Sequence, residues 1–318
     1  MDAPKHPVLS VLLPVYNAEA YVSEALESIL NQTFKDFEVL VADDGSVDST
    51  RQIIDAYEDS RIRRLHSDVN RGKVAICDFL LKYAEGVYVT VHDGDDWSDV
   101  NRFEKQVSLL TSNPRLGMCG CGFRSYDAKG TFISNHVMPT DFDTIKLEIR
   151  LRSQFHGPTM MFRKSILNEI GGLYRYFTHA EDIDFSMRVI EKYEAVNLPD
   201  LLYNYRVHTE SLTNRIGLIN DQRFINYELI NFLADQRKQK GIDSLMSGDT
   251  EEFEEVRASL LEFYLNDPTL KYDRAIGGFL SLNMWAQAFK VFLICLFRHP
   301  LKMNTYKILK NMIQQVYA

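Results

Sequence analysis

The sequence predicts an α/β protein with a mostly parallel sheet flanked by helices and a C-terminal helical extension. Over roughly the first hundred residues, short apolar runs alternate with amphipathic helical patterns, which is typical of parallel strands joined by right-handed crossovers. From about residue 214 onward the pattern is helical throughout. At 318 residues the chain is about twice the size of a usual domain, so it accommodates one large α/β domain or two units.

The composition is that of a globular protein. Apolar residues make up 45% of the chain and charged residues 25%, which excludes disorder, collagen and coiled coil. The net charge of −8 argues against a general nucleic-acid binder, which usually carries a basic excess. The four scattered cysteines fit neither a disulfide framework nor a four-ligand zinc site, which favours a reducing compartment.

Neither an export signal nor a membrane span is expected. The apolar stretch at residues 8–15 is broken by Pro14. The uncharged run at residues 275–289 falls short of the roughly 20 apolar residues that cross a bilayer. We therefore expect a soluble, cytoplasmic protein.

The first strand is expected at residues 8–13, an apolar run that Pro14 stops. Asn17 is expected to cap the following helix, because its side chain can accept from a free backbone N–H. That helix carries one apolar stripe, formed by Val22, Ala25, Leu26, Ile29 and Leu30.

The remaining elements follow in chain order from the same kinds of pattern. Strands are expected at residues 38–42, 61–66, 87–91, 117–123 and 158–162, with short extended pieces at 196–199 and 203–207. Helices are expected after Ser49 and Gly72, at about 100–110, in a segment that ends at Gly171-Gly172, and at about 181–192.

Two acidic clusters directly follow strands of this sheet: Asp43-Asp44, and Asp93 with Asp95 and Asp96. The carboxyl ends of parallel strands meet at one edge, so these carboxylates are expected to converge there. Crowded carboxylates repel one another unless a cation or hydrogen-bond donors compensate. Hard oxygen ligands suit Mg²⁺ or Mn²⁺ on a diphosphate. The alternative, in which these residues merely form turns and cap helices, stays open from the residues alone.

The order of motifs resembles the family-2 inverting glycosyltransferases of the GT-A fold. The likeness covers about residues 8–213. It is carried by LSVLLPVYN at 9–17, SILNQTF at 28–34, VADDGS at 41–46, Asp93 to Asp96, Gly171-Gly172 and Glu181-Asp182. By this resemblance, residues 1–105 would be the nucleotide-sugar-binding half of a GT-A domain. Residues 106–213 would be its acceptor-binding half, and 214–318 a helical region.

The resemblance implies roles in binding the donor. Pro14, Tyr16 and Asn17 would line the nucleotide pocket, with Tyr16 stacking on the base. Asp44 would accept a hydrogen bond from the base, and Asp93 would approach the ribose or the metal.

The metal would be Mg²⁺ or Mn²⁺, held on the diphosphate by Asp95 and Asp96. His208 would contact the diphosphate or the metal, although a packing histidine is an open alternative. Lys73 could meet a phosphate, although a solvated lysine is the commoner outcome.

Asp182 would be the general base that takes a proton from an acceptor hydroxyl during a single inverting displacement. Acidic residues in the first turn of a helix also complement its dipole, and this alternative explains Glu181, Asp182 and Asp184 by itself. His156 could border the acceptor site.

The chain departs from the family pattern at one place. The helix after Asn70-Arg71-Gly72 usually carries an Arg-Asn pair that helps to hold the nucleotide, and here those positions are Cys77-Asp78. Either Arg71 or Lys73 would substitute for the arginine, or the base preference would differ.

The C-terminal segment reverses the overall charge. Residues 281–318 contain five Lys or Arg and no acidic residue. Aromatic and aliphatic residues interleave with these cations, namely Trp285, Phe289, Val291, Phe292, Leu296 and Phe297. Such a segment is typical of helices that lie in an anionic membrane interface. The alternative is packing on the catalytic domain or on a second subunit.

We therefore expect a metal-dependent, inverting hexosyl- or hexosaminyl-transferase that uses a UDP-linked sugar donor. Its acceptor would be a glycan or a lipid-linked saccharide in cell-surface polysaccharide assembly, at the inner face of the cell membrane, and no nucleic-acid partner is expected. A sugar-phosphate nucleotidyltransferase is one alternative, but the N-terminal region lacks a basic, glycine-rich phosphate loop. A non-catalytic sugar- or nucleotide-binding module is the other. P-loop and zincin motifs do not occur in the sequence.

Overall fold

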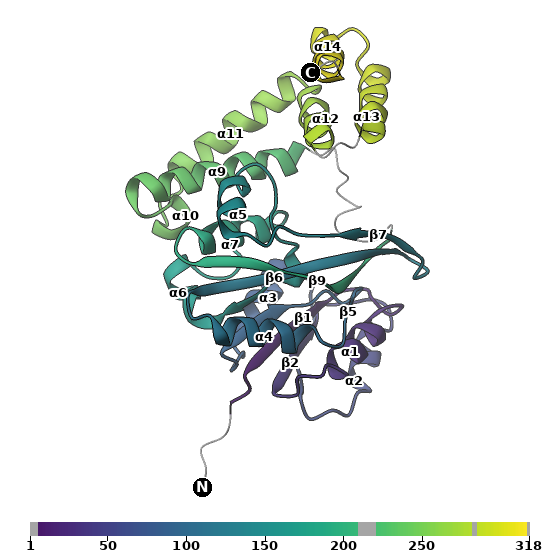
Figure 1. Ribbon diagram of the computed structural model, residues 1–318, viewed down its shortest axis with the longest axis vertical. Coiled ribbons are helices and arrows are strands. Elements are labelled where there is room, and N and C mark those ends of the chain that lie inside the picture. The colour runs from purple at the N-terminus through teal and green to yellow at the C-terminus, as the bar shows by residue number, and fades with distance from the viewer. Residues whose placement is uncertain (1–5, 209–220, 282–284, 317–318) are drawn as a thin grey trace. The chain divides into compact units, whose positions relative to one another are not determined.

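The computed structural model describes residues 6–208, 221–281 and 285–316 (Figure 1). The chain divides into two compact units, Met1–His208 and Thr209–Ala318. The domain boundary expected between residues 213 and 214 lies outside the described residues.

The helices and strands are as follows. The strands are β1 (Leu9–Val15), β2 (Phe37–Asp43), β3 (Ile62–Arg64), β4 (Tyr88–Val91), β5 (Trp97–Ser98), β6 (Leu116–Asp127), β7 (Phe132–His136), β8 (Met161–Arg163) and β9 (Glu194–Val207). The first unit's helices are α1 (Val22–Leu30), α2 (Thr50–Asp55), α3 (Lys73–Leu81), α4 (Arg102–Ser112), α5 (Phe142–Glu148), α6 (Leu167–Ile170) and α7 (Glu181–Ile190), with 3-10 turns η1 (Gly157–Thr159) and η2 (Lys164–Ile166). The second unit's helices are α9 (Asp221–Lys240), α10 (Ser244–Ser247), α11 (Glu251–Asn266), α12 (Leu270–Ser281), α13 (Trp285–Arg298) and α14 (Met303–Val316).

The described strands form one sheet in the order β3-β2-β1-β4-β8-β6-β9-β5, with β7 paired to β6. β3, β2, β1 and β4 are parallel, as the sequence predicts. β8 is antiparallel to both of its neighbours, and β6 and β9 are again parallel to each other. The α/β class with a helical C-terminal region is confirmed, and the sheet is mixed.

The strand order reverses beside β1. β1, β2 and β3 step outward in one direction, and β4 then returns to the other side of β1. In open α/β sheets, ligands bind beyond the carboxyl ends of the strands at such a reversal. The topology therefore places the expected site between the loops that follow β1 and β4.

One hydrophobic core holds α1, α2 and α4 against a single face of the sheet. Leu9, Val11, Leu13 and Val15 of β1 point into it at the period of two that a strand imposes. The five apolar residues expected on one stripe of α1 are the ones that this helix buries. That prediction is confirmed.

Pro14 does not end the first strand, which continues to Val15. The carbonyl of Leu12 accepts from the N–H of His92, so the backbone N–H and C=O groups of the even-numbered residues of β1 face β4. β4 ends opposite Leu12, so at Pro14 no β4 residue remains to receive an N–H. The donor that proline lacks therefore costs no ladder hydrogen bond.

Asn17 does not cap the following helix, contrary to the sequence prediction. α1 begins at Val22, after Tyr21. Asn17 instead adopts φ +48°, and its Oδ1 accepts from the N–H of Val47 at 3.0 Å. Its side chain therefore ties the loop after β1 to the loop after β2.

Two expectations for the later strands are also corrected. Residues 157–159 form a 3-10 turn, and only Met161–Arg163 is a strand. The pieces expected at 196–199 and 203–207 belong to the single strand β9. Its pairing with β6 jumps from Leu198 to Leu201, so Pro199 lies in a bulge that needs no ladder donor.

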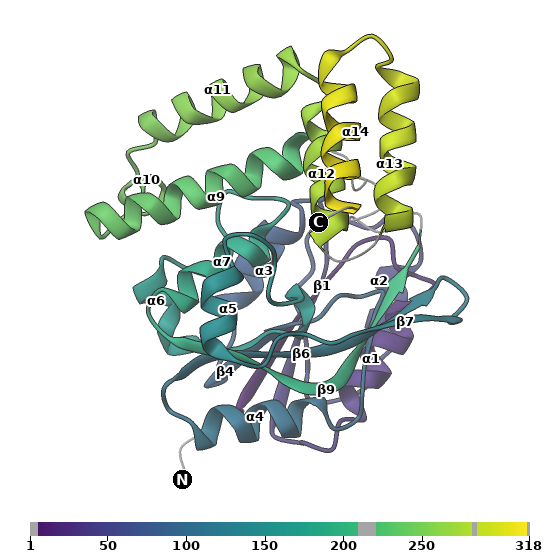
Figure 2. The same cartoon turned by 45° about the horizontal axis from the view of Figure 1, so that its top comes forward.

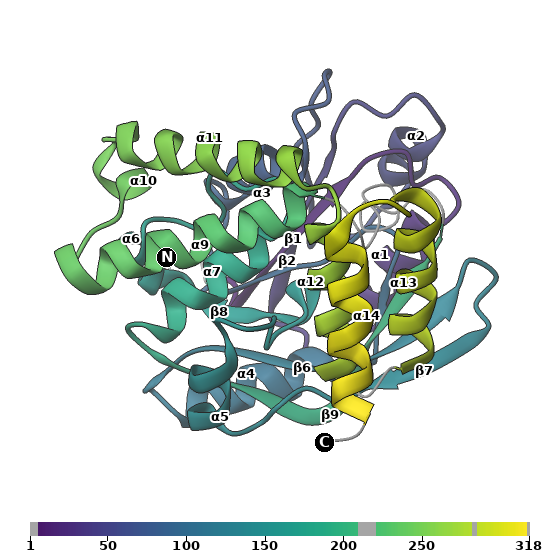
Figure 3. The ribbon, with the colours of Figure 1, turned by 90° about the horizontal axis from the view of Figure 1, so that it is seen from above.

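The second unit is helical in every described element. α9 and α11 run side by side (Figure 3), and α13 and α14 form a hairpin that packs on α12 (Figure 2). Among the described residues, every helix is too short or too polar to cross a bilayer.

The turn before β4 offers a test of backbone packing. A Cβ on Gly86 would lie 2.5 Å from the backbone nitrogen of Ser10, whose hydroxyl accepts from the Gly86 N–H at 2.8 Å. We expect Gly86→Ala to lower the free energy of unfolding by about 1–3 kcal/mol, measured by urea denaturation.

Gly277→Ala is the control. Nothing lies within 4 Å of a Cβ at this position in α12, so alanine should be neutral or stabilise by about 0.5–1 kcal/mol. Equal stability of the two variants would contradict the packing argument.

Candidate functional site

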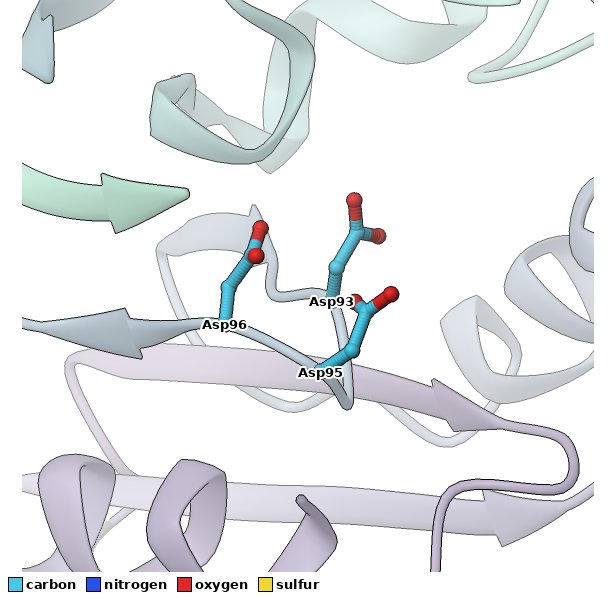
Figure 4. Close-up of side chains that lie close together, drawn as sticks. All are labelled: Asp93, Asp95 and Asp96. Carbon is cyan, nitrogen blue, oxygen red and sulfur yellow. The ribbon is translucent and has the colours of Figure 1, made fainter. Parts of the chain in front are cut away.

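Three carboxylates gather in the loop that follows β4. One oxygen each of Asp93, Asp95 and Asp96 lies within 4.8 Å of the other two. All three side chains project to the same side of the loop (Figure 4). The convergence expected from the sequence is therefore present at the strand-order reversal.

Asp95 and Asp96 have different surroundings. Asp95 Oδ2 lies 2.8 Å from Nε2 of His208, which follows β9. Asp96 is buried, and its Oδ1 accepts from the N–H of Arg206 at 2.7 Å. Its Oδ2 is buried without a hydrogen-bond partner. Burial raises the pKa of Asp96 well above its usual value, and the charges of Asp95 and Asp93 raise it further.

These residues fit a divalent cation. An unpartnered buried oxygen beside two other carboxylates is costly, and a bound cation would relieve both the desolvation and the repulsion. Carboxylate oxygens with one imidazole suit Mg²⁺ or Mn²⁺. Of the residues expected to hold the metal, Asp95 and Asp96 lie together and His208 contacts Asp95, and the assignment stays a prediction.

Lys73 joins this cluster to α7. Its Nζ lies 2.6 Å from Asp93 Oδ1 and 4.0 Å from Glu181 Oε1. Burial opposes its charge, but Asp93 and Glu181 raise the pKa of Lys73 well above its usual value. Although burial opposes ionisation of Asp93 too, Lys73 lowers the pKa of that carboxyl. Lys73 is a half-buried member of the site, paired with Asp93, rather than a solvated lysine.

Asp44 positions the start of the helix that carries Lys73. Its two carboxylate oxygens accept from the N–H groups of Arg71 and Gly72 at 2.9 and 2.8 Å. The expected hydrogen bond to a base would use the second lone pair of one of these oxygens. In the structure, Asp44 stabilises the loop that precedes α3.

Cys77 stands where the resemblance described above leads us to expect an arginine. It lies four residues after Lys73, so both side chains share one face of α3. Burial raises the pKa of the Cys77 thiol, so the thiol remains neutral. Lys73, one turn earlier, supplies a cation on that face, whereas Arg71 is exposed.

The three acidic residues at the start of α7 separate into two groups. Asp184 is fully buried and accepts from Arg175 and Arg188 at 2.5–3.0 Å, so it is a structural ion pair. Glu181 faces Lys73. Burial raises the pKa of Glu181 to about 7; Lys73 opposes this rise, and Asp182 adds to it.

Asp182 lies against a residue that has no side chain. A Cβ on Gly157 would come within 3.1 Å of Asp182 Oδ2. Ala180, just before this helix, adopts φ +69°, which is uncommon for alanine. With Asn17, it is one of two non-glycine residues with positive φ among those the structure describes. Both border predicted site residues, where backbone strain tends to be retained.

His156 precedes Gly157 and is stacked on Phe123, with 4.0 Å between the ring centroids. Burial lowers its pKa to about 3, and its Nε2 is buried without a partner. His156, which was expected to border the acceptor site, immediately precedes Gly157, and Gly157 lies against Asp182.

At the nucleotide end, Pro14 is buried within β1 and Tyr16 is 41% exposed just after it. A partly exposed ring beyond the end of a strand can stack on a planar base. Asn17 serves its loop contacts, as described above.

Two supporting residues were missed by the sequence reasoning. Arg206 lies over the rings of Tyr21 and Trp97, and its Nε donates to the backbone oxygen of Asp95 at 3.0 Å. The hydroxyl of Tyr203 accepts from the N–H of Asp93 at 3.3 Å. Arg206 lies two residues before His208, and this strand spacing, which puts both on one side, could have identified it.

The chain resembles known proteins in sequence and in fold. The family model described as glycosyl transferase family 2 matches residues 10–171. The chain belongs to this family. Among its relatives, EpsE of Bacillus subtilis is 30% identical over 215 residues, which cover 66% of this chain and 76% of EpsE.

Another relative is the UDP-Glc:alpha-D-GlcNAc-diphosphoundecaprenol beta-1,3-glucosyltransferase WfgD of Escherichia coli, 28% identical over 65% of this chain and 80% of WfgD. The structure of S. aureus TarS in complex with UDP-GlcNAc shares the fold, with a TM-score of 0.60 and 20% identity over 96% of this chain and 88% of that one. The GT-A fold expected from the sequence is confirmed.

Glu181 predicts a pH dependence of stability. Its folded pKa of about 7 exceeds the usual 4.5, so the folded state favours the protonated form. Stability should therefore fall as the pH rises from 4.5 through about 7, because the unfolded chain ionises more readily. In Glu181→Gln the free energy of unfolding should fall less over this pH range. Urea denaturation at pH values on either side of the window, with a chelator present to remove metal ions, measures this.

Glu262→Gln is the control, since this carboxyl is exposed on α11. It should follow the wild-type pH profile. If Glu181→Gln showed the same pH dependence of unfolding free energy as the wild type, the pKa of Glu181 would not be raised in the folded state.

Proposed function

We propose that this chain is an inverting, metal-dependent glycosyltransferase that moves a hexosyl or hexosaminyl group from a UDP-linked donor to an acceptor hydroxyl. One observation carries the proposal. Lys73 reaches both Asp93, beside the metal-type carboxylates, and Glu181, beside the proposed base Asp182. The residues that would bind the diphosphate and the residue that would accept the proton would therefore lie at one rim of the sheet. Residues 1–105 would bind the donor and residues 106–213 the acceptor.

The donor assignment draws on relatives and on the site. The name of WfgD specifies UDP-Glc, and TarS was solved with UDP-GlcNAc. In this chain Pro14, Tyr16 and Asn17 would line the nucleotide pocket, with Asp44 accepting from the base. Lys73 would pair with the diphosphate in place of the arginine that Cys77 replaces.

Asp95, Asp96 and His208 would hold Mg²⁺ or Mn²⁺, and Asp93 would lie toward the ribose or the metal. The bound cation would neutralise charge on the diphosphate and so improve it as a leaving group. The unpartnered Asp96 oxygen supports this assignment.

Asp182 would accept the proton of the acceptor hydroxyl. The acceptor oxygen forms a bond to the anomeric carbon as the bond from that carbon to the diphosphate breaks. The nucleoside diphosphate leaves from the opposite face, so the configuration inverts in one displacement. Gly157 leaves room for the carboxylate, and the neighbouring Glu181 with Lys73 would position it.

The acceptor would be a glycan or a lipid-linked saccharide of cell-surface polysaccharide assembly. The name of WfgD specifies a diphosphoundecaprenol-linked acceptor, which supports this class. Transfer would then occur at the inner face of the cell membrane, with residues 214–318 as a peripheral attachment.

Two variants should distinguish the role of Asp182 as general base from the role of Asp95 as metal ligand. Asp182→Asn should lower the transfer rate about 100-fold or more, because an amide accepts no proton, and should leave UDP binding intact. Asp95→Ala should remove the extra thermal stabilisation that Mn²⁺ gives to the UDP complex. Transfer would be measured as UDP release and donor binding by thermal shift with and without Mn²⁺.

Asp78→Asn is the matched control, because this carboxyl is exposed on α3. Near-normal transfer by Asp182→Asn would refute the base assignment. Release of sugar 1-phosphate instead of UDP from the UDP-sugar donor would indicate nucleotidyl transfer.

The Lys73 assignment has its own test. Lys73→Met should weaken UDP binding about tenfold or more, since a charged hydrogen bond contributes about 1.5–3 kcal/mol. Lys73→Arg should retain most of the affinity. Lys73→Met/Cys77→Arg should recover it, because the new guanidinium would lie on the same face of α3. Isothermal titration with UDP and Mn²⁺ measures all three, and wild-type affinity in Lys73→Met would exclude the assignment.

A further inference from the structure

The hairpin of α13 and α14 has a buried side and an exposed side. Ala288, Val291, Phe292 and Cys295 of α13 pack into a core shared with α12 and α14. Val291 and Phe292, which the sequence placed among residues for a membrane, are therefore internal. The buried side of the α13–α14 hairpin therefore packs on α12 within the second unit. The exposed apolar residues of the hairpin need a separate explanation.

Large apolar side chains are exposed along α13, in the turn after it and at the start of α14. On α13 they recur every fourth residue, and they continue beyond its end. We call this set the apolar edge: Trp285, Phe289, Leu293, Phe297, Leu301 and Met303. At its end Phe297, Leu301 and Met303 are 89%, 94% and 75% exposed, so three nearly bare side chains lie at the end of α13, in the connecting turn and at the start of α14.

The charges on this hairpin have a single sign. The hairpin carries Lys290, Arg298, Lys302, Lys307 and Lys310, and residues 285–316 contain no carboxylate side chain. Within the described part of the chain, none of these cations forms an ion pair with a carboxylate. The acidic residues of the second unit gather elsewhere, with five glutamates on α11.

We propose that the α13–α14 turn docks end-on into an anionic lipid surface. The end of the apolar edge, formed by Phe297, Leu301 and Met303, would enter the region between headgroups and acyl chains, and Arg298, Lys302 and Lys307 would meet lipid phosphates. Exposed apolar side chains rimmed by unpaired cations match such a surface in both polarity and charge. The glutamates of α11 would be repelled by the same surface, which orients the unit.

A second copy of this chain fits the edge poorly. Two such edges in contact would bring ten cations together with no carboxylate from either hairpin, and like charges at an interface are costly. A bilayer rich in anionic lipid offers the opposite charge. The inference does not depend on the transferase reaction, because binding to vesicles is measured without donor or acceptor.

The test uses the full chain and co-sedimentation with vesicles of phosphatidylcholine alone or mixed equally with phosphatidylglycerol. The variant Phe297→Ser/Leu301→Ser/Met303→Ser removes the exposed end of the edge without altering the core. We expect its partition to the mixed vesicles to fall roughly tenfold or more.

The control is Leu147→Ser/Leu151→Ser/Leu265→Ser, whose leucines are 79%, 80% and 76% exposed but lie outside the apolar edge. It should bind as the wild type does. Lys302→Glu/Lys307→Glu should also lose roughly tenfold or more, and most of the preference for phosphatidylglycerol.

Three results would overturn the proposal. The first is equal vesicle binding by the edge variant and the control. The second is wild-type binding that is indifferent to phosphatidylglycerol. The third is a wild-type dimer, seen by light scattering, that only the edge variant dissociates, since the edge would then be an interface between copies.

Discussion

The mutual repulsion of carboxylates at one rim of the sheet is the constraint on which the site depends. The loop after β4 and the start of α7 bring five acidic side chains into one region. The ion pair of Lys73 with Asp93 compensates part of this negative charge. His208 and the N–H of Arg206 offset part of the remainder, at Asp95 and Asp96. One oxygen of Asp96 stays unpartnered, and this unpaired acceptor supports the proposal of a cation at the rim.

The fold supplies the geometry through rigid elements. β1 and β4 end side by side where the strand order reverses, β9 brings His208 to the same edge, and α7 presents Glu181 and Asp182. Asp44 braces the turn before α3 and so sets the direction of Lys73. The residues proposed for donor and acceptor chemistry therefore share one rim although they come from distant parts of the chain.

The second unit carries its charge unevenly, and this matters for a transferase whose acceptor is proposed to be lipid-linked. Cations collect on the α13–α14 hairpin and glutamates on α11. A chain of net negative charge can approach an anionic surface only if its cations are concentrated in one place. The exposed apolar edge lies among those cations.

Local patterns determined much of this protein from sequence alone. The apolar stripe of α1, the parallel strands β1 to β4 and the two acidic clusters were predicted, because periods of 3.6 and 2 and the residues after each strand are local properties. Specific motif order was also enough to identify the family.

The tertiary structure decided the partners. Only the folded chain separates Asp184, held by Arg175 and Arg188, from Asp182 in the same helical turn. Likewise, only it places Lys73 between Asp93 and Glu181, and Arg206 behind Asp95. The physical reason is that these contacts join residues far apart in the chain, or on faces set by burial. Their energies depend on strand order and desolvation, which no short stretch of sequence contains.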